Sequence, residues 1–175
     1  FLIETLCVEV DEKNKALLSK RNLTHFDSLE EVNEDLDLIF SSYVQNIEDD
    51  ISILKDMGSK LSANGKIYLY LPAKMFLWSD LDEKAGHFRR YEIGELKAKC
   101  RQAGLKIEKL HYADCIGFFA SLSMKVIGFN NQTGVGSTKS LKFYDKWIFP
   151  VSNFLDQCGF KKIFGKNIIL IASNN

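Results

Sequence analysis

The chain has 175 residues, a length that fits one domain, and its 46% hydrophobic and 26% charged residues are close to the average of globular proteins. Only two prolines and 11 glycines exclude a collagen-like chain and argue against a disordered linker. Basic and acidic residues number 23 each, so the net charge is zero, and we predict no nucleic-acid partner because such proteins normally carry a basic excess.

The charges are unevenly distributed along the chain. Residues 1–60 contain 14 acidic and 6 basic side chains, whereas residues 61–175 contain 9 and 17. Such a split is typical of two faces with different ligands, but two solvated faces of opposite sign explain it equally well.

The four cysteines form no CxxC pair and no Cys/His cluster with zinc spacing, so we predict no metal site. Each lies among apolar neighbours, which favours a cytoplasmic protein with reduced thiols. The sequence shows no signal peptide and no apolar run of transmembrane length. It begins with Phe-Leu-Ile-Glu instead of Met, and we therefore expect it to be part of a longer reading frame.

Hydropathy patterns predict alternating strands and helices in the first part of the chain. In chain order these are a strand at residues 6–10, a helix to about residue 20, strands at 23–26 and 36–40, a helix from 49 to 64, and a strand at 66–71. Asp11 can cap the first helix, and Asn64-Gly65 is expected to end the second.

Residues 73–91 show no clean period and predict a long loop. The elements expected after it are a helix at 92–103, a strand at 105–112, an apolar helix at 116–129, a helix at 141–157 with a kink at Pro150, and a strand at 167–173. This order predicts an α/β fold with a doubly wound, mostly parallel sheet. We expect one domain, residues 1–175, in which residues 113–160 form a helical insertion or lid before the last strand.

In a doubly wound sheet, ligands bind outside the carboxyl ends of the strands. The side chains that end or follow the predicted strands include Glu9, Asp27, Ser41, Ser42 and Tyr43. An acid at the position of Glu9 can accept both hydroxyls of a ribose. Glu9 also fits a solvated strand end, Asp27 a turn, and Tyr43 the core.

Several segments together resemble a known family. Residues 37–50, a helix, and then Leu-Ser-Ala-Asn-Gly-Lys-Ile-Tyr-Leu-Tyr-Leu at 61–71 resemble the middle of class I S-adenosylmethionine-dependent methyltransferases. Val-Glu-Val-Asp at 8–11 resembles the acidic end of that family's second strand, and residues 77–91 resemble a subset with Gly-His-x-Arg-Arg-Tyr after a strand. The resemblance covers residues 5–112, and the strand at 167–173 also fits.

The resemblance implies a Rossmann-like enzyme that uses S-adenosylmethionine to methylate an oxygen or nitrogen of a small-molecule acceptor. Glu9 would hold the ribose and Asp27 would face the adenine, while Ser41, Ser42 and Tyr43 would border the methionine and sulfonium. The alternative is a non-catalytic α/β module of the same ancestry, which serves in binding or structure.

Two departures from the family pattern matter. The family's first strand and its glycine-rich loop have no counterpart before residue 6, and Gln45-Asn46 stands where the family has Glu-His. In the family, the first strand lies between the second and the fourth. The strand at 6–10 could therefore pair directly with that at 36–40, or a second copy could close the gap and form a homodimer. We favour a third alternative, in which the parent protein contains the strand.

The loop at 74–91 contains the candidate catalytic residue, His87, which can take a proton from an oxygen or nitrogen acceptor or simply order the loop. Arg89 and Arg90 can bind a carboxylate or phosphate, although one of them can instead pair with Asp82 or Glu83. Trp78 and Tyr91 complete the predicted substrate-binding set, and the spacing of the acids and His87 argues against a metal site.

The apolar helix at 116–129 and the aromatic residues of the next helix can cover the acceptor pocket, or they can be plain core packing. These aromatic residues are Phe143, Tyr144, Trp147 and Phe149. A membrane-surface role is a further alternative, because an apolar helix near Lys161, Lys162 and Lys166 can meet a lipid-linked substrate.

Overall fold

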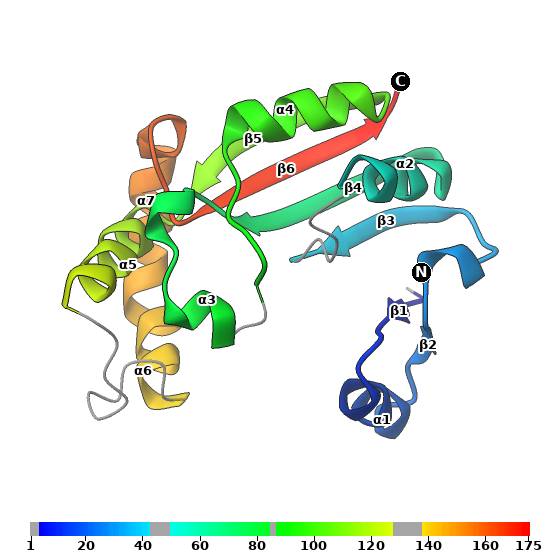
Figure 1. Cartoon of the computed structure of the whole chain (residues 1–175), viewed down its shortest axis with the longest axis horizontal. Helices are drawn as coiled ribbons and strands as arrows, with labels where there is room; N and C mark the ends of the chain where they lie inside the picture. The colour runs from blue at the N-terminus through cyan, green and yellow to red at the C-terminus, as the bar shows by residue number, and fades with distance from the viewer. Residues whose placement is uncertain (1–3, 43–49, 85–86, 128–137) are drawn as a thin grey trace.

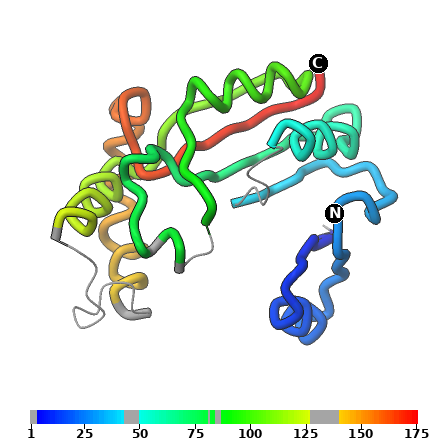
Figure 2. The backbone as a smooth tube through the Cα atoms, viewed as in Figure 1, coloured from blue at the N-terminus to red at the C-terminus, as the bar shows by residue number. Residues whose placement is uncertain are grey.

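The computed structural model of the chain describes residues 4–42, 50–84, 87–127 and 138–175, which are coloured in Figures 1 and 2. Its strands are β1 (Leu6–Val8), β2 (Thr24–Phe26), β3 (Leu36–Ser41), β4 (Leu61–Pro72), β5 (Leu105–Ala113) and β6 (Asn167–Asn174). Its α-helices are α1 (Glu12–Lys20), α2 (Asp50–Ser59), α3 (Asp80–Lys84), α4 (Ile93–Gln102), α5 (Cys115–Ile127), α6 (Thr138–Phe143) and α7 (Phe149–Gln157). Shorter turns are η1 (Leu29–Glu31), η2 (Met75–Leu77), the π-helical η4 (Tyr144–Ile148) and η5 (Phe160–Lys162).

The described strands form two sheets. β1 pairs with β2 in parallel, and the other four strands follow the order β3-β4-β6-β5. β3 and β4 are parallel, whereas β6 runs antiparallel to both β4 and β5. The α/β sheet predicted from the sequence is confirmed, and β6 is the strand of the larger sheet that runs against the others.

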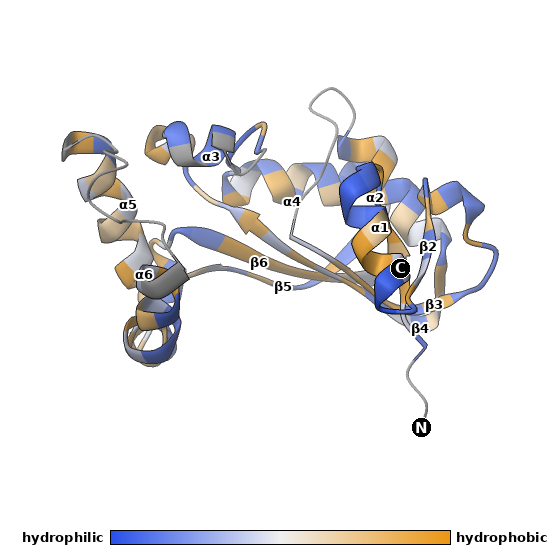
Figure 3. Ribbon diagram, turned by 90° about the horizontal axis from the view of Figure 1, so that it is seen from below, coloured by the Kyte–Doolittle hydropathy of each residue, from blue (hydrophilic) through white to orange (hydrophobic). Residues whose placement is uncertain are grey.

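The core lies where β4 and β6 meet the helices. Leu69 of β4 and Leu170 of β6 are fully buried, and alternate residues on either side of them are buried too: Ile67, Leu71, Ile168 and Ala172. Leu54 of α2 and Leu96 of α4 pack against this cluster from one side of the sheet (Figures 1 and 3). The alternation matches strands that have one face in the core.

The β1–β2 sheet stands apart from β3 (Figure 1). No hydrogen-bonded ladder joins β1 to β3 in the residues that the structure describes. The alternative in which the strand at 6–10 pairs directly with that at 36–40 is therefore wrong. Both strands expose apolar side chains, Val8 by 47% and Leu38 and Phe40 by 62% each.

The expected helix end at Asn64-Gly65 is also wrong. Helix α2 ends at Ser59, and β4 already begins at Leu61. The ladder between β3 and β4 is irregular here, and a Cβ on Gly65 would lie 2.5 Å from the carbonyl oxygen of Leu36. Glycine is required at this position because two strands approach each other closely, and it does not end a helix.

The predicted loop is more regular than expected, since residues 73–91 contain the short η2 and α3. Residues 138–157 are helical throughout. The kink predicted at Pro150 falls next to an irregularity, because the π-helical turn Tyr144–Ile148 ends two residues before this proline, which cannot donate a backbone hydrogen bond.

We expect Leu170→Ala to lower the free energy of unfolding by about 2–5 kcal/mol, because it leaves a cavity at the centre of the sheet. Leu38→Ala is the matched control, since Leu38 is 62% exposed on β3 whereas Leu170 is fully buried. The control should change stability by less than about 0.5 kcal/mol. Urea unfolding followed by circular dichroism measures both, and equal losses would contradict the assignment of β6 as the central strand.

Candidate functional site

Glu9 and Asp27 follow two adjacent parallel strands. Val8 pairs with Phe26, and the backbone N–H of Glu9 donates to the carbonyl of Phe26 at 3.0 Å. The structure thus brings the predicted ribose and adenine residues to neighbouring strand ends. Asp27 forms an ion pair with Lys15 at 2.6 Å, so its carboxylate already has a partner.

The carboxylate of Glu9 is held by its own loop. It accepts hydrogen bonds from the backbone N–H groups of Val10 and Asp11 at 2.9 Å each, and from the amide of Asn14 at 3.1 Å. An ionised carboxylate offers about four lone-pair sites, so capacity remains for a hydroxyl donor. The chemistry of this strand end therefore fits a ribose.

A cavity of about 390 Å³ lies at the ends of β3 and β4, where β6 begins. This volume is in the range of small-molecule sites. Its walls come from three regions of the chain: the strand ends, the loop before α4, and α5. The lining residues are Ser42, Tyr70, Pro72, Ser79, Asp82, His87, Arg90, Ser121, Met124, Lys166 and Asn167.

Asp82 organises the loop wall of the cavity. Its Oδ2 accepts hydrogen bonds from the backbone N–H of Ser79 and from Arg90 Nη2, both at 3.0 Å. The bond from Ser79 is half of a capping box at the start of α3. Burial opposes ionisation of Asp82, but hydrogen bonds from His87 and Arg90 outweigh it and lower the pKa of the carboxyl group.

Arg90 fastens the loop to the sheet. Its guanidinium is almost fully buried and donates to the carbonyl of Ala73 at 3.0 Å as well as to Asp82. This contact matches the alternative in which one arginine pairs with Asp82. Arg90 also lines the cavity, so a structural role and a contact with substrate are compatible.

His87 faces the cavity with a defined partner. Its Nδ1 lies 3.2 Å from Oδ1 of Asp82, and its backbone N–H donates to the carbonyl of Asp82 at 2.8 Å. Because an ionised carboxylate can only accept, Nδ1 carries the proton in this contact. Nε2 is then the basic nitrogen of the neutral ring.

Arg89 and Tyr91 lie in a different cluster. Arg89 pairs with Glu95 and with Asp50, and the buried Tyr91 donates its hydroxyl to Asp50 at 3.2 Å. Lys99 also binds Asp50. These groups tie α2 to α4, and neither Arg89 nor Tyr91 lines the cavity. Sequence reasoning missed Asp50, which is 39 positions from Arg89.

The remaining predicted residues are divided between the cavity and other places. Ser42 lines the cavity, and Ser41 is the last residue of β3. Trp78 is half-buried after η2 and is not part of the lining. Tyr43 lies outside the described residues.

Sequence reasoning missed the wall formed by Tyr70, Lys166 and Asn167. The amide of Asn167 donates to the hydroxyl of Tyr70 at 2.8 Å. Burial, together with the charge of Asp114, raises the pKa of Tyr70 to about 12, so the hydroxyl stays protonated and can donate a hydrogen bond. Tyr70 sits two residues before Pro72, a position that the rule of strand ends could have included.

The aromatic residues expected over the pocket point elsewhere. Phe143, Trp147 and Phe149 are 60, 60 and 42% exposed, and Tyr144 donates its hydroxyl to Asp114. The apolar helix predicted with them does reach the cavity, since α5 contributes Ser121 and Met124 to its wall.

Two further properties bear on the kind of site. Within the described ranges, no three His, Cys, Asp or Glu side chains gather as metal ligands would. Among the helices of those same ranges, none has both the length and the apolar character that crossing a bilayer requires.

No family model matches the sequence, and no curated protein matches it. Solved structures do match. An S-adenosylmethionine-dependent methyltransferase from Mesorhizobium loti aligns with 95% of this chain and 78% of its own length, at 12% identity and a TM-score of 0.55. One from Archaeoglobus fulgidus aligns with 97% and 76%, at 16% identity and a TM-score of 0.54. Phosphoethanolamine N-methyltransferase 2 of Haemonchus contortus, in complex with S-adenosyl-L-methionine, aligns with 98% and 43%, at 14% identity and a TM-score of 0.54.

The chain thus has the fold of class I S-adenosylmethionine-dependent methyltransferases, as the resemblance predicted. It spans 39% and 43% of the length of two matching structures, and 76–78% of others. At these identities the likeness concerns the fold, and activity has to be argued from the residues of this chain.

We expect Asp82→Asn to lower the free energy of unfolding by about 3–5 kcal/mol at neutral pH, because Arg90 then stays buried without its counter-charge. The folded-state pKa of Asp82 lies below its ordinary value of 3.8. The stabilisation is therefore fully present above pH 3.8 and is lost as the pH falls through the lower, folded-state pKa.

Urea unfolding of both proteins at several pH values checks this prediction. Glu83→Gln is the matched control, since Glu83 is the next residue and is exposed. The difference between wild type and Asp82→Asn should stay constant above about pH 5 and shrink only in stronger acid. A difference that vanishes at neutral pH, or that the control reproduces, would contradict the role of the buried pair.

Proposed function

We propose that the chain acts in S-adenosylmethionine-dependent methyl transfer to an oxygen or nitrogen of a small molecule. Glu9 carries this proposal: a carboxylate with remaining acceptor capacity at the end of β1, beside the end of β2, in a chain with the methyltransferase fold. The solved complex of a matching methyltransferase with S-adenosyl-L-methionine supports the choice of cofactor.

The cofactor supplies an electrophilic methyl group on a sulfonium. Glu9 would accept a hydrogen bond from a ribose hydroxyl, and Asp27 would face the adenine after partial release from Lys15. Ser41 and Ser42, at the end of β3, would border the methionine end. These side chains fit the nucleoside half of the cofactor best, because carboxylates and hydroxyls can accept hydrogen bonds from it.

The cavity would receive the acceptor molecule. Its volume of about 390 Å³ and its mixed lining suit a compact, partly polar compound. Tyr70 would donate a hydrogen bond to that compound, and Lys166 places positive charge in the wall, whereas the charge of Arg90 is paired with Asp82. A substrate with an anionic or phenolic group is the chemistry that this wall favours.

His87 would act as the general base. Nε2 would accept the proton that the acceptor's oxygen or nitrogen loses when it is methylated, and Asp82 would stabilise the imidazolium that results. The buried pair with Arg90 keeps Asp82 ionised and in place. The same arrangement orients the ring before the substrate arrives.

A calorimetric titration with S-adenosylmethionine tests the cofactor proposal. We expect Glu9→Ala to weaken binding about 10- to 150-fold, the range for losing a hydrogen bond to a charged group. Glu4→Ala is the matched control, because Glu4 is an exposed acid before β1. Absence of binding by the wild-type chain would favour the non-catalytic module, and equal binding by both variants would remove Glu9 from the site.

The role of His87 is tested by release of S-adenosylhomocysteine with a panel of phenols, carboxylates and amines. We expect His87→Ala to lower turnover by about 10²–10⁴-fold while the affinity for S-adenosylmethionine is unchanged. His87→Asn separates the two roles, since its amide can still donate to Asp82 from near the position of Nδ1. A purely structural histidine would be rescued by Asn, whereas a general base would not.

A further inference from the structure

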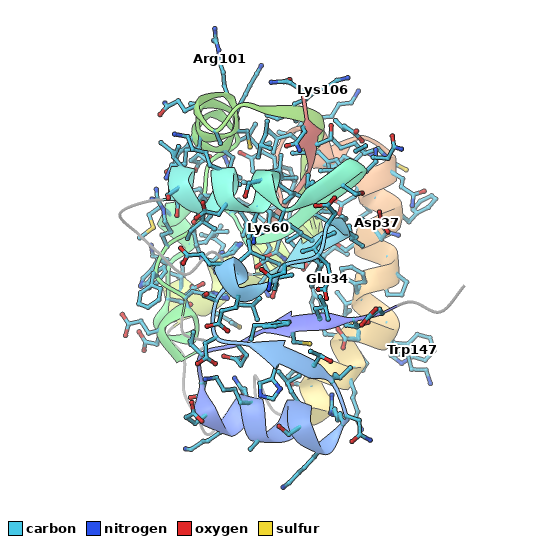
Figure 4. All side chains as sticks on the ribbon, turned by 90° about the vertical axis from the view of Figure 1, so that its right-hand side faces the viewer. Glu34, Asp37, Lys60, Arg101, Lys106 and Trp147 are labelled. Atoms are coloured by element: carbon cyan, nitrogen blue, oxygen red, sulfur yellow. The ribbon has the colours of Figure 1, made fainter. Side chains whose placement is uncertain are left out.

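The helix at residues 138–157 carries exposed apolar side chains, three of them aromatic, that the proposed reaction does not use. Phe143, Trp147, Val151 and Phe154 are 60, 60, 52 and 64% exposed. Their spacing of four, four and three residues puts them on one side of the helix, and we call them the aromatic stripe. Figure 4 shows Trp147 projecting outward from the edge of the molecule. Apolar patches of this kind mark interaction sites.

The helix is firmly attached on its other side, so the exposure of the stripe does not come from a loose segment. The hydroxyl groups of Tyr144 and Ser152 donate to Asp114 at 2.6 and 2.8 Å. Asp156 accepts a hydrogen bond from the backbone N–H of Asp114 at 2.7 Å. These bonds join the helix to the end of β5, and the stripe is displayed on a fixed support.

Lysine side chains accompany the stripe. Lys142 and Lys146 are exposed, and Nζ of Lys146 lies 5.4 Å from the ring centroid of Trp147. Residues 138–163 contain five lysines and two aspartates, and one of these aspartates, Asp156, is buried. The surface of this segment is therefore cationic as well as aromatic.

We propose that the aromatic stripe docks the chain onto the surface of an anionic lipid bilayer. Helices that lie in a membrane interface combine apolar and aromatic residues with lysines on their polar surface, and here Lys142 and Lys146 flank the stripe. Tryptophan prefers the interface because its ring is apolar and its N–H needs a polar partner. Each lysine near an anionic surface adds attraction that neutral lipids do not provide.

A second copy of the chain is a poorer occupant of the same surface. A two-fold contact of the stripe with itself would join two surfaces that both carry exposed lysines, Lys142 and Lys146, and their like charges oppose the contact. A bilayer presents no such conflict. The docking proposal also stands without the methyl-transfer proposal, since it uses a different face of the chain.

Flotation with lipid vesicles tests the proposal on the whole chain. We expect binding to vesicles of equal parts phosphatidylglycerol and phosphatidylcholine, and little binding to phosphatidylcholine alone. The double variant Phe143→Ser/Trp147→Ser should bind about tenfold or more weakly. The double variant Lys142→Gln/Lys146→Gln should bind about 30-fold more weakly, from roughly fivefold for each charge.

The control is the double variant Leu38→Ser/Phe40→Ser, because these side chains are 62% exposed on β3, outside the stripe. It should bind vesicles like the wild type. The proposal is overturned if the wild type binds neither vesicle, or binds both equally. It is also overturned if the control loses binding as the stripe variant does.

Sedimentation velocity tests whether a second copy of the chain occupies the surface instead. A dimer that the stripe variant abolishes, without vesicle binding, assigns the surface to a second copy. Unfolding curves show whether each variant is folded. If the aromatic variant does not fold, the lysine variant alone tests the proposal.

Discussion

Strand β6 lies between β4 and β5 and runs in the direction opposite to both. Its first residue, Asn167, pairs with Pro72 on one side and Ala113 on the other, so the beginning of β6 meets the carboxyl ends of two parallel strands. Ile168, Leu170 and Ala172 of β6 alternate with less buried residues, and a slip of one residue would turn this buried set toward solvent. The same register brings the amide of Asn167 to the hydroxyl of Tyr70. The packing that holds the sheet together therefore also positions a wall of the cavity.

The polar side of the cavity depends on a different interaction, the buried pair of Asp82 and Arg90. Arg90 reaches the carbonyl oxygens of Ala73 and Lys166, which lie just after β4 and just before β6. Removing a buried charge from its partner is expensive, so the loop has little freedom once the sheet has formed. His87 binds the same carboxylate through Nδ1 and is oriented by it. A single ion pair thus couples the sheet ends to the candidate base.

Local patterns predicted the alternating elements and the strand ends, because both follow from residues close together in the sequence. The antiparallel direction of β6 could not be predicted in this way, because it depends on pairing between segments far apart in the sequence. Arg89 and Arg90 illustrate a second limit. They are chemically identical neighbours on a non-helical segment, yet Arg90 turns toward the cavity and Arg89 toward Asp50. Only the folded positions of Asp50 and Asp82 distinguish them. Gly65 is a third case, because the close carbonyl of Leu36 that requires glycine comes from another strand.

Asp114 relates the cavity to the aromatic stripe. This residue follows β5 in a left-handed conformation, with φ of 63°, which aspartate tolerates better than most residues. Its carboxylate accepts the backbone N–H of Gly117 at 3.0 Å and so caps α5, the helix that lines the cavity. It also accepts the hydroxyls of Tyr144 and Ser152 from the helix that carries the stripe. A Cβ on Gly117 would lie 2.0 Å from Oδ2 of Asp114, so the close approach requires glycine. One buried carboxylate thus holds both the helix that lines the cavity and the helix that carries the stripe.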